Sequence, residues 1–94
     1  MAKTTYLVHI ELERGTTADY LRLRTLMEGS GFSKIIEGDR GFYTLPLGVY
    51  KATSENDADH VLNVAKNNAA RVRSRYKAIV TDYVHARWVG LSNA

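Results

Sequence analysis

DYLRLRTLMEGSGFSKII, residues 19–36, is the stretch of sequence that decides the fold. Apolar residues recur in it at the spacing of one helix face, as in the pair Leu23 and Met27. Gly29 and Gly31 follow, and glycine readily adopts the left-handed conformation in which many helices end. The stretch therefore predicts a helix, a tight exit and then a strand. The predicted buried face of the helix consists of Tyr20, Leu23, Leu26 and Met27.

The segment before this helix alternates between apolar and polar residues over residues 4–12, which is typical of a strand with one buried face. His9 and Glu11 fall on the face opposite the apolar set. Thr16 followed by Asp19 resembles a capping box, so we expect the helix to start there. The apolar set is Tyr6, Val8, Ile10 and Leu12.

The remaining elements follow from local signals downstream of the helix. We expect one strand over residues 32–45, interrupted near 38–41, then a proline turn at 45–48 and a strand at 49–53. Ser54 with Asp57 predicts the start of a second helix, and residues 76–85 predict the last strand. The buried stripe of the second helix is expected to comprise Ala58, Val61 or Leu62, Ala65, Ala69 and Val72.

The element order is β-α-β-β-α-β, which predicts an α+β protein of the ferredoxin-like architecture. This fold has a four-stranded antiparallel sheet with both helices on one face. Ninety-four residues fit a single domain, residues 1–94. The chain has no cysteine, so a reducing cytoplasm is the expected compartment. No apolar run approaches the ~20 residues that span a bilayer, so we expect no membrane partner.

Basic side chains are unevenly distributed along the chain, whose net charge is +3. Residues 1–65 hold seven basic and nine acidic side chains, whereas residues 66–94 hold six basic ones and only Asp82 against them. A basic segment joined to a slightly acidic body indicates an anionic partner, and nucleic acid is the first candidate. The alternative is a solvated helix face that aids solubility.

Two arginines on the first helix are candidates for phosphate chemistry. Arg22 and Arg24 lie two residues apart, so they project about 200° apart around the helix axis. Arginine can hold a phosphate through two parallel donors and can stabilise the charge that builds up when a phosphodiester is cleaved. The structural alternative is that both side chains only extend past apolar neighbours toward water.

His9 and Glu11 share one face of the first strand. A histidine beside a carboxylate could act as a base with its orienting group, or could hold a divalent metal. The alternative is that both are ordinary polar residues on a solvent-exposed sheet face. No established metal-ligand spacing occurs in the sequence, so the residues themselves predict no metal site and no cofactor.

A second group of basic residues surrounds the end of the second helix. The helix dipole favours cations there for purely structural reasons. Tyr76 lies among them, and basic residues interleaved with aromatic ones suit single-stranded RNA. With Arg22, the predicted RNA-binding residues are Arg71, Arg73, Arg75, Lys77 and Arg87.

The run YLRLRTLM, residues 20–27, followed by GFSKII, residues 31–36, resembles the GhoS family of small antitoxins from type V toxin–antitoxin systems. The opening YLVHIE, residues 6–11, also fits the first strand of that family. The resemblance extends over residues 6–53. It implies a ferredoxin-like fold related to small CRISPR-associated endonucleases that work as dimers.

The resemblance further implies an endoribonuclease that cleaves the messenger of a small membrane toxin. It singles out the second arginine of the LRLR run, which is Arg24 here. The related CRISPR nucleases carry an acidic metal-binding residue at the end of the first strand, and Glu11 is the nearest equivalent. A Mg²⁺ ion is therefore left open by the resemblance.

Three functions remain to be separated. The first is an antitoxin-like endoribonuclease that cuts single-stranded messenger RNA with Arg24, Glu11 and His9 as catalytic residues. The second is a non-catalytic module on the same fold that binds RNA or protein. The third is a small protein inhibitor of phage or mobile-element origin. We also expect a homodimer, paired at the exposed edge of the last strand with the Arg87–Trp88 tail.

Overall fold

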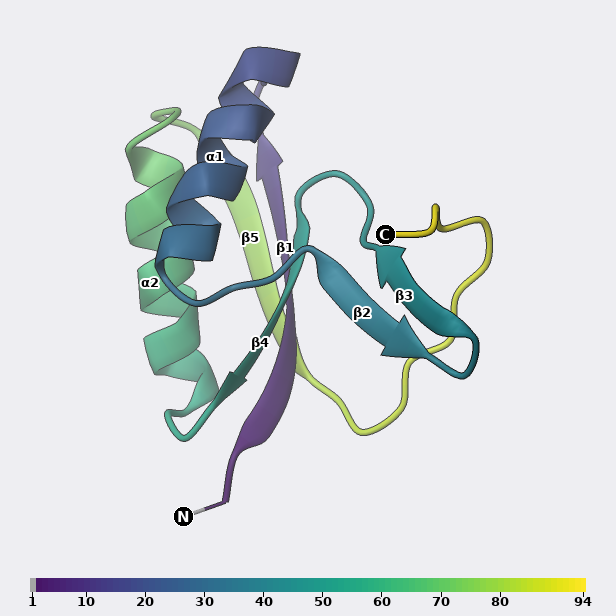
Figure 1. The fold of residues 1–94 in the computed structure, drawn as a ribbon. Coiled ribbons are helices and arrows are strands. Elements are labelled where there is room, and N and C mark those ends of the chain that lie inside the picture. Colours follow the sequence, from purple (N-terminus) through teal and green to yellow (C-terminus); the bar gives the residue numbers. More distant parts are fainter. Residues whose placement is uncertain (1) are drawn as a thin grey trace.

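The computed structural model describes residues 2–94 as a small α+β fold with two helices and antiparallel sheets (Figure 1). The elements in chain order are β1 (Thr4–Leu12), α1 (Thr17–Gly29), β2 (Ile35–Gly38), β3 (Gly41–Thr44), β4 (Val49–Ser54), α2 (Ala58–Ala70) and β5 (Tyr76–Asp82).

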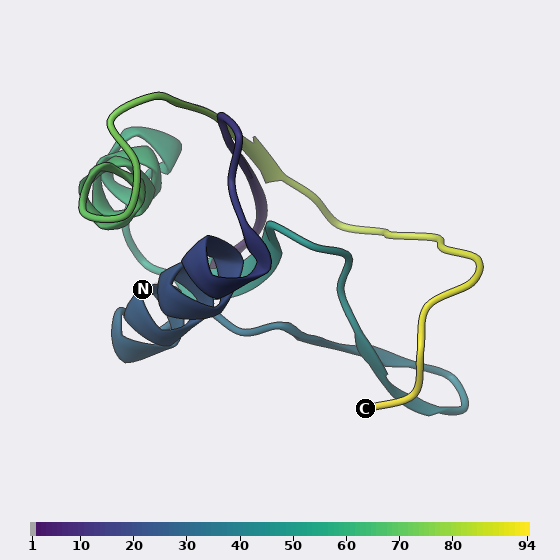
Figure 2. The same cartoon turned by 90° about the horizontal axis from the view of Figure 1, so that it is seen from above.

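The larger sheet has the strand order β4-β1-β5, and both neighbours of β1 run antiparallel to it. The alternation predicted for β1 is observed, because Val8 and Ile10 are fully buried whereas His9 and Glu11 are exposed. Leu23 of α1 and Ala65 of α2 join the same core cluster. Figures 1 and 2 show both helices on that buried face, as expected. The opposite face, which carries His9 and Glu11, is called the open face below.

Helix α1 begins and ends as its sequence predicts. The Thr16 side chain accepts a hydrogen bond from the Asp19 backbone N–H at 3.1 Å, and the Asp19 carboxylate accepts one from the Thr16 N–H at 3.0 Å. At the other end Gly31 has a φ of +93°. The N–H of Phe32 donates to the Met27 carbonyl at 3.0 Å, which completes a Schellman exit.

The single strand predicted over residues 32–45 is wrong in one respect, because the chain reverses within it. Residues 35–38 and 41–44 form a separate antiparallel hairpin, β2 with β3, instead of one interrupted strand. In the described part of the chain, Ser33 is the one residue of this region that pairs with the larger sheet, through an isolated bridge to Lys51. The single four-stranded sheet that we expected is therefore replaced by a three-stranded sheet and a two-stranded one.

Two smaller predictions need correction, and one alternative is resolved. Helix α2 is capped by Asp57, which accepts from the His60 N–H at 2.9 Å, rather than by Ser54. Of the two residues proposed for its buried stripe, Val61 is buried and Leu62 is half-buried. The turn before β4 is shifted by one residue, since the Val49 N–H donates to the Pro46 carbonyl at 3.0 Å.

The tail, residues 83–94, folds against the hairpin instead of extending β5 to residue 85. The Thr44 N–H donates to the Ser92 carbonyl at 2.8 Å. The Trp88 ring lies 5.6 Å from the Tyr43 ring, and a Cβ atom at Gly38 would come within 2.7 Å of it. Trp88 is thus packed on the hairpin. It does not extend the edge of β5, where we expect the Arg87–Trp88 tail to form part of a dimer surface.

Lys34 is a buried cation that clamps the turn before β4. Its ammonium donates to the carbonyls of Pro46 and Val49, the second at 3.1 Å, and lies 5.1 Å from the centre of the Tyr50 ring. Burial is the main cause that lowers the pKa of Lys34 to about 8; the charge of the nearby Arg24 acts in the same direction and that of Glu28 opposes it. The Lys34 ammonium therefore has a pKa within the pH range that ordinary buffers cover.

This pKa predicts the pH dependence of stability. The folded pKa of about 8 lies below the ordinary value of 10.5, so between these values the unfolded chain binds more protons. The free energy of unfolding should therefore rise with pH above about 8 and level off near 10. Above pH 10 Tyr50 acts in the opposite direction, because its folded pKa is raised from 10.0 to about 12, so the folded chain then binds more protons. Urea unfolding over this pH range measures the slope. In Lys34→Met the rise should disappear, and an unchanged slope would contradict the assignment.

Candidate functional site

The end of β1 and the start of β5 form a pocket of about 750 Å³, here called the strand-end pocket. The register pairs Glu11 with Lys77, and the Glu13 N–H donates to the Arg75 carbonyl at 3.1 Å. These two contacts bring Glu11, Arg75 and Lys77, three of the predicted site residues, to one place. The lining residues are Glu11, Glu13, Arg14, Ser74, Arg75, Tyr76 and Lys77.

Arg14 joins this pocket through an unusual backbone conformation, with a φ of +54°. A non-glycine residue in this region is uncommon and must be held by its surroundings. Arg73 provides such a contact, because its Nη2 donates to the Arg14 carbonyl at 2.8 Å. The Nε of Arg73 donates to the Asp19 carboxylate at 2.9 Å.

Arg73 therefore differs from the other predicted RNA-binding residues. Its guanidinium ties the loop before β5 to the start of α1. The backbone N–H of Thr16 holds the pKa of Asp19 below its ordinary value, and the charge of Arg73 acts in the same direction. Asp19 thus stays charged and keeps Arg73 engaged, so we place Arg73 in the support of the pocket.

His9 and Glu11 are both exposed on the open face, as predicted. His9 lies opposite Ile79 of β5 and Val49 of β4, whereas Glu11 lies opposite Lys77. Opposite charges in directly paired positions favour each other. Glu11 thus lines the strand-end pocket, and His9 lies two residues farther along the same face.

The structure does not bring Arg24 to these residues. Arg24 belongs to α1, which packs on the buried face of the sheet, and its Nε lies 3.4 Å from the Glu28 carboxylate. Its charge also acts on the pKa of Lys34 and Tyr50, at the β4 side of the fold. Arg22 is exposed on the same helix. The predicted catalytic set is therefore divided between the two sides of the sheet.

The last two predicted RNA-binding residues lie apart from the strand-end pocket. Arg71 is exposed at the C-terminal cap of α2. Arg87 is exposed in the tail, where its guanidinium donates to the neighbouring Ala86 carbonyl at 2.9 Å. Cations are favoured at the C-terminal end of a helix, and this accounts for Arg71 without a ligand.

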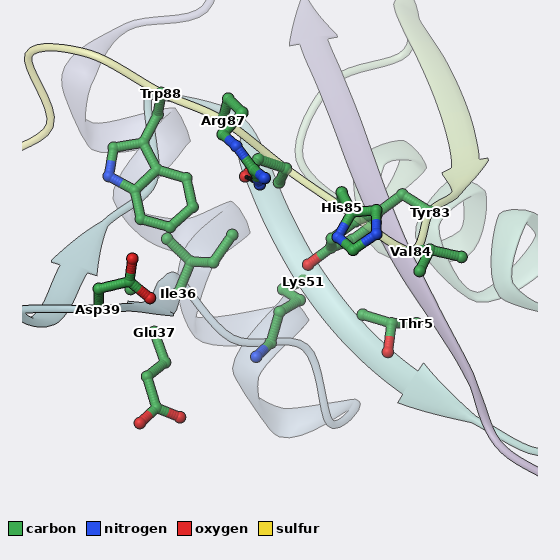
Figure 3. Close-up of a pocket in the computed structure, with 12 residues that line it drawn as sticks. Thr5, Ile36, Glu37, Asp39, Lys51, Tyr83, Val84, His85, Arg87 and Trp88 are labelled. Carbon is green, nitrogen blue, oxygen red and sulfur yellow. Dashed lines mark hydrogen bonds between the residues drawn. The ribbon is translucent and has the colours of Figure 1, made fainter.

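A second concave region of about 680 Å³, here called the tail groove, lies between the larger sheet, the hairpin and the tail (Figure 3). Sequence reasoning did not anticipate it. Lys51 lies between its two walls, with Trp88 and Asp39 on one side and Tyr83 on the other. Burial raises the pKa of Tyr83. The groove depends on where the tail folds back, and no local signal in the sequence indicates this.

A divalent metal has no assembled site in residues 2–94. No group of three or more histidine, cysteine, aspartate or glutamate side chains in this part of the chain comes together to hold one. Glu11 and Glu13 share the strand-end pocket with three cations, which disfavours a further positive charge. The residues present therefore do not fit the Mg²⁺ ion that the resemblance leaves open.

None of the helices described for residues 2–94 is long and apolar enough to cross a membrane.

No protein-family model matches this chain, and no curated protein is significantly similar to it.

Proposed function

We propose that this protein binds single-stranded RNA through the strand-end pocket. The observation that carries the proposal is the convergence of Arg14, Arg75 and Lys77 around one concave region. Arginine and lysine contact phosphates, which supply much of the affinity for nucleic acid. Tyr76 lies opposite the buried Leu12, so its ring packs on the core side of β5, and the three cations rather than a stacked base carry the proposal.

A ferredoxin-like fold belongs to the same proposal. The order β4-β1-β5 corresponds to three adjacent strands of that architecture, all antiparallel. The bridge between Ser33 and Lys51 lies on the free side of β4, where the fourth strand of such a sheet would pair. A homodimer is a further part of the proposal, because β5 is an edge strand whose outer side pairs with no other strand of residues 2–94. Light scattering at micromolar concentrations tests it, and a monomer would contradict it.

The binding experiment uses a labelled single-stranded RNA of roughly 12 nucleotides, the upper range of common site sizes. We expect affinity to fall steeply with salt, with a log–log slope near about −2 for three phosphate contacts on a single strand. Fluorescence anisotropy measures the slope, and duplex RNA of the same sequence is the control. Absence of binding at low salt would contradict the proposal.

RNA cleavage, as in an endoribonuclease antitoxin of GhoS type, is the second candidate function. The observation that favours it is that His9 and Glu11 lie exposed on the open face, with Glu11 in the strand-end pocket. In this position a catalytic general base would lie beside the groups that hold the phosphate. The resemblance adds Arg24, which in one chain lies on the other side of the sheet.

Arg24→Ala separates the two functions. If the protein is a nuclease of this type, the variant should abolish cleavage of a pool of single-stranded RNAs while keeping RNA affinity and the fold. Glu28→Ala is the matched control, since it removes the partner of Arg24 but not the guanidinium. Gel analysis with magnesium or chelator measures cleavage. Undiminished cleavage by Arg24→Ala would refute its role, and binding without any cleavage would identify a non-catalytic module.

A further inference from the structure

The tail groove and the strand-end pocket lie at opposite ends of the open face. The tail groove includes Thr5 at the start of β1, and the strand-end pocket includes Glu11 near its end. Six residues of strand separate them, which corresponds to roughly 20 Å. His9 and Ile79 lie on the face between the two sites. Ile79 is exposed to 61%, so the path between the sites is partly apolar.

The tail groove combines side chains that suit one nucleotide. Trp88 offers a flat aromatic surface, Lys51 and Arg87 offer cations, and Glu37 and Asp39 offer carboxylates. In Figure 3 the Asp39 carboxylate lies below the Trp88 ring, and Lys51 lies between Glu37 and Thr5. A base stacked on Trp88 would therefore have a carboxylate near its edge and a cation within the same groove for its phosphate.

We propose that the tail groove binds one nucleotide of single-stranded RNA, with the base stacked on Trp88 and the phosphate toward Lys51 and Arg87. This inference rests on the proposed function, since RNA held in the strand-end pocket would supply the nucleotide. A free nucleotide has the same chemistry and is the other source. The formal charges in the groove balance, so stacking and hydrogen bonds must select the ligand rather than net charge.

The groove is built before any ligand arrives. The tail that forms one wall is fixed to β3 by backbone hydrogen bonds, Thr44 N–H to the Ser92 carbonyl at 2.8 Å and Ala94 N–H to the Phe42 carbonyl at 3.0 Å. Trp88 is braced by the Tyr43 ring. A preformed wall reduces the ordering cost of binding.

The carboxylates predict a base preference. Adenine, cytosine and guanine each carry an exocyclic amino group that can donate to Glu37 or Asp39. Uracil instead has two carbonyl oxygens on either side of its one N–H, and a carboxylate repels these oxygens. We therefore expect the groove to favour amino-bearing bases over uracil.

The distance between the sites predicts a length requirement. One strand that reaches from the strand-end pocket to the tail groove must cover roughly 20 Å, or about six nucleotides at a stacked rise of ~3.4 Å. Shorter oligonucleotides can occupy only one site. Affinity should therefore increase sharply when the RNA becomes long enough to reach both.

Trp88 is the only tryptophan in the sequence, so its fluorescence reports on the tail groove directly. We expect oligo(A) of roughly 12 nucleotides to quench it, and oligo(U) to bind about tenfold more weakly. Lys51→Ala should weaken oligo(A) binding about tenfold with the fold intact by circular dichroism. Asp39→Asn should bring the two affinities close together. Arg40→Ala, also exposed in the hairpin turn but outside the groove lining, is the matched control and should change nothing.

The outcomes separate this inference from the proposed function. If RNA binds, and Arg75 and Lys77 matter, but Trp88 fluorescence and the Lys51→Ala affinity stay unchanged, the groove is not an RNA subsite and the proposed function survives. If RNA does not bind but adenosine monophosphate quenches Trp88, the proposed function fails and the groove binds a free nucleotide. Absence of quenching by both ligands overturns the inference.

Discussion

Reversing two charges in the strand-end pocket, Arg75→Glu with Lys77→Glu, should lower the affinity for single-stranded RNA by about 100-fold. Each change replaces a cation that can contact phosphate by a carboxylate that repels it. A hydrogen bond to a charged group contributes ~1.5–3 kcal/mol, and 1.4 kcal/mol corresponds to about tenfold in affinity. Both side chains are exposed, so the fold should persist. Anisotropy titration near about 0.1 M salt measures the loss, because screening is moderate there.

The matched control for this prediction is Lys3→Glu with Lys66→Glu. These lysines are also exposed, and their reversal changes the net charge by the same amount. They lie outside the strand-end pocket, so we expect a loss of only a few-fold through the long-range field. Equal losses in both double variants would mean that RNA responds to net charge alone, and the pocket assignment would then be wrong.

The helices were predictable because their signals are local. Thr16 and Asp19 lie three residues apart, and their reciprocal hydrogen bonds form within one turn. Gly31 supplies the positive φ that the exit of α1 needs. The alternation in β1 likewise depends only on neighbouring residues, since one face of the strand meets the core.

The hairpin was not predictable, because its cause lies far along the chain. Residues 32–45 carry apolar residues on both sides of Gly38 and Gly41, which fits one interrupted strand or two short ones. The structure selects two, and Trp88 then occupies the space over Gly38 that a side chain would fill. The tail completes the arrangement by pairing with β3, which no local pattern near residue 40 indicates.

The candidate site was partly predictable. The distribution of charge along the sequence indicated Arg75 and Lys77, but their proximity to Glu11 depends on the register between β1 and β5. A shift of one residue would turn Glu11 to the other face. Arg14 was missed because its place in the pocket depends on a left-handed backbone that sequence does not reveal. The supporting role of Arg73 has no local signal in the sequence, because its bonds to Asp19 and to the Arg14 carbonyl span more than fifty residues.

Gly48→Ala should be the most destabilising glycine-to-alanine substitution in this fold. Gly48 lies in the turn before β4 with a φ of +75°, which alanine adopts only at a cost of ~1–2 kcal/mol. An added Cβ would also lie 2.2 Å from the Ile10 carbonyl oxygen, which is a backbone atom of the central strand and cannot rotate away. The turn would have to shift, and with it the hydrogen bond from the Ile10 N–H to the Gly48 carbonyl.

The two causes can be separated with two further glycines. Gly31→Ala meets the same strain, at φ +93°, but no atom of the described residues lies within 4 Å of the new Cβ. Gly29 is the last residue of α1, its φ is not positive, and no atom of the described residues lies within 4 Å of an added Cβ. Gly29→Ala should therefore be neutral or slightly stabilising. In urea unfolding, we expect the free energy of unfolding to change by about zero for Gly29→Ala, to fall by about 1–2 kcal/mol for Gly31→Ala, and to fall by at least about 3 kcal/mol for Gly48→Ala. A Gly48 loss equal to that of Gly31 would mean that β1 and the turn yield freely. A larger one would mean that the β1–turn contact is rigid, as the Lys34 clamp on the same turn also predicts.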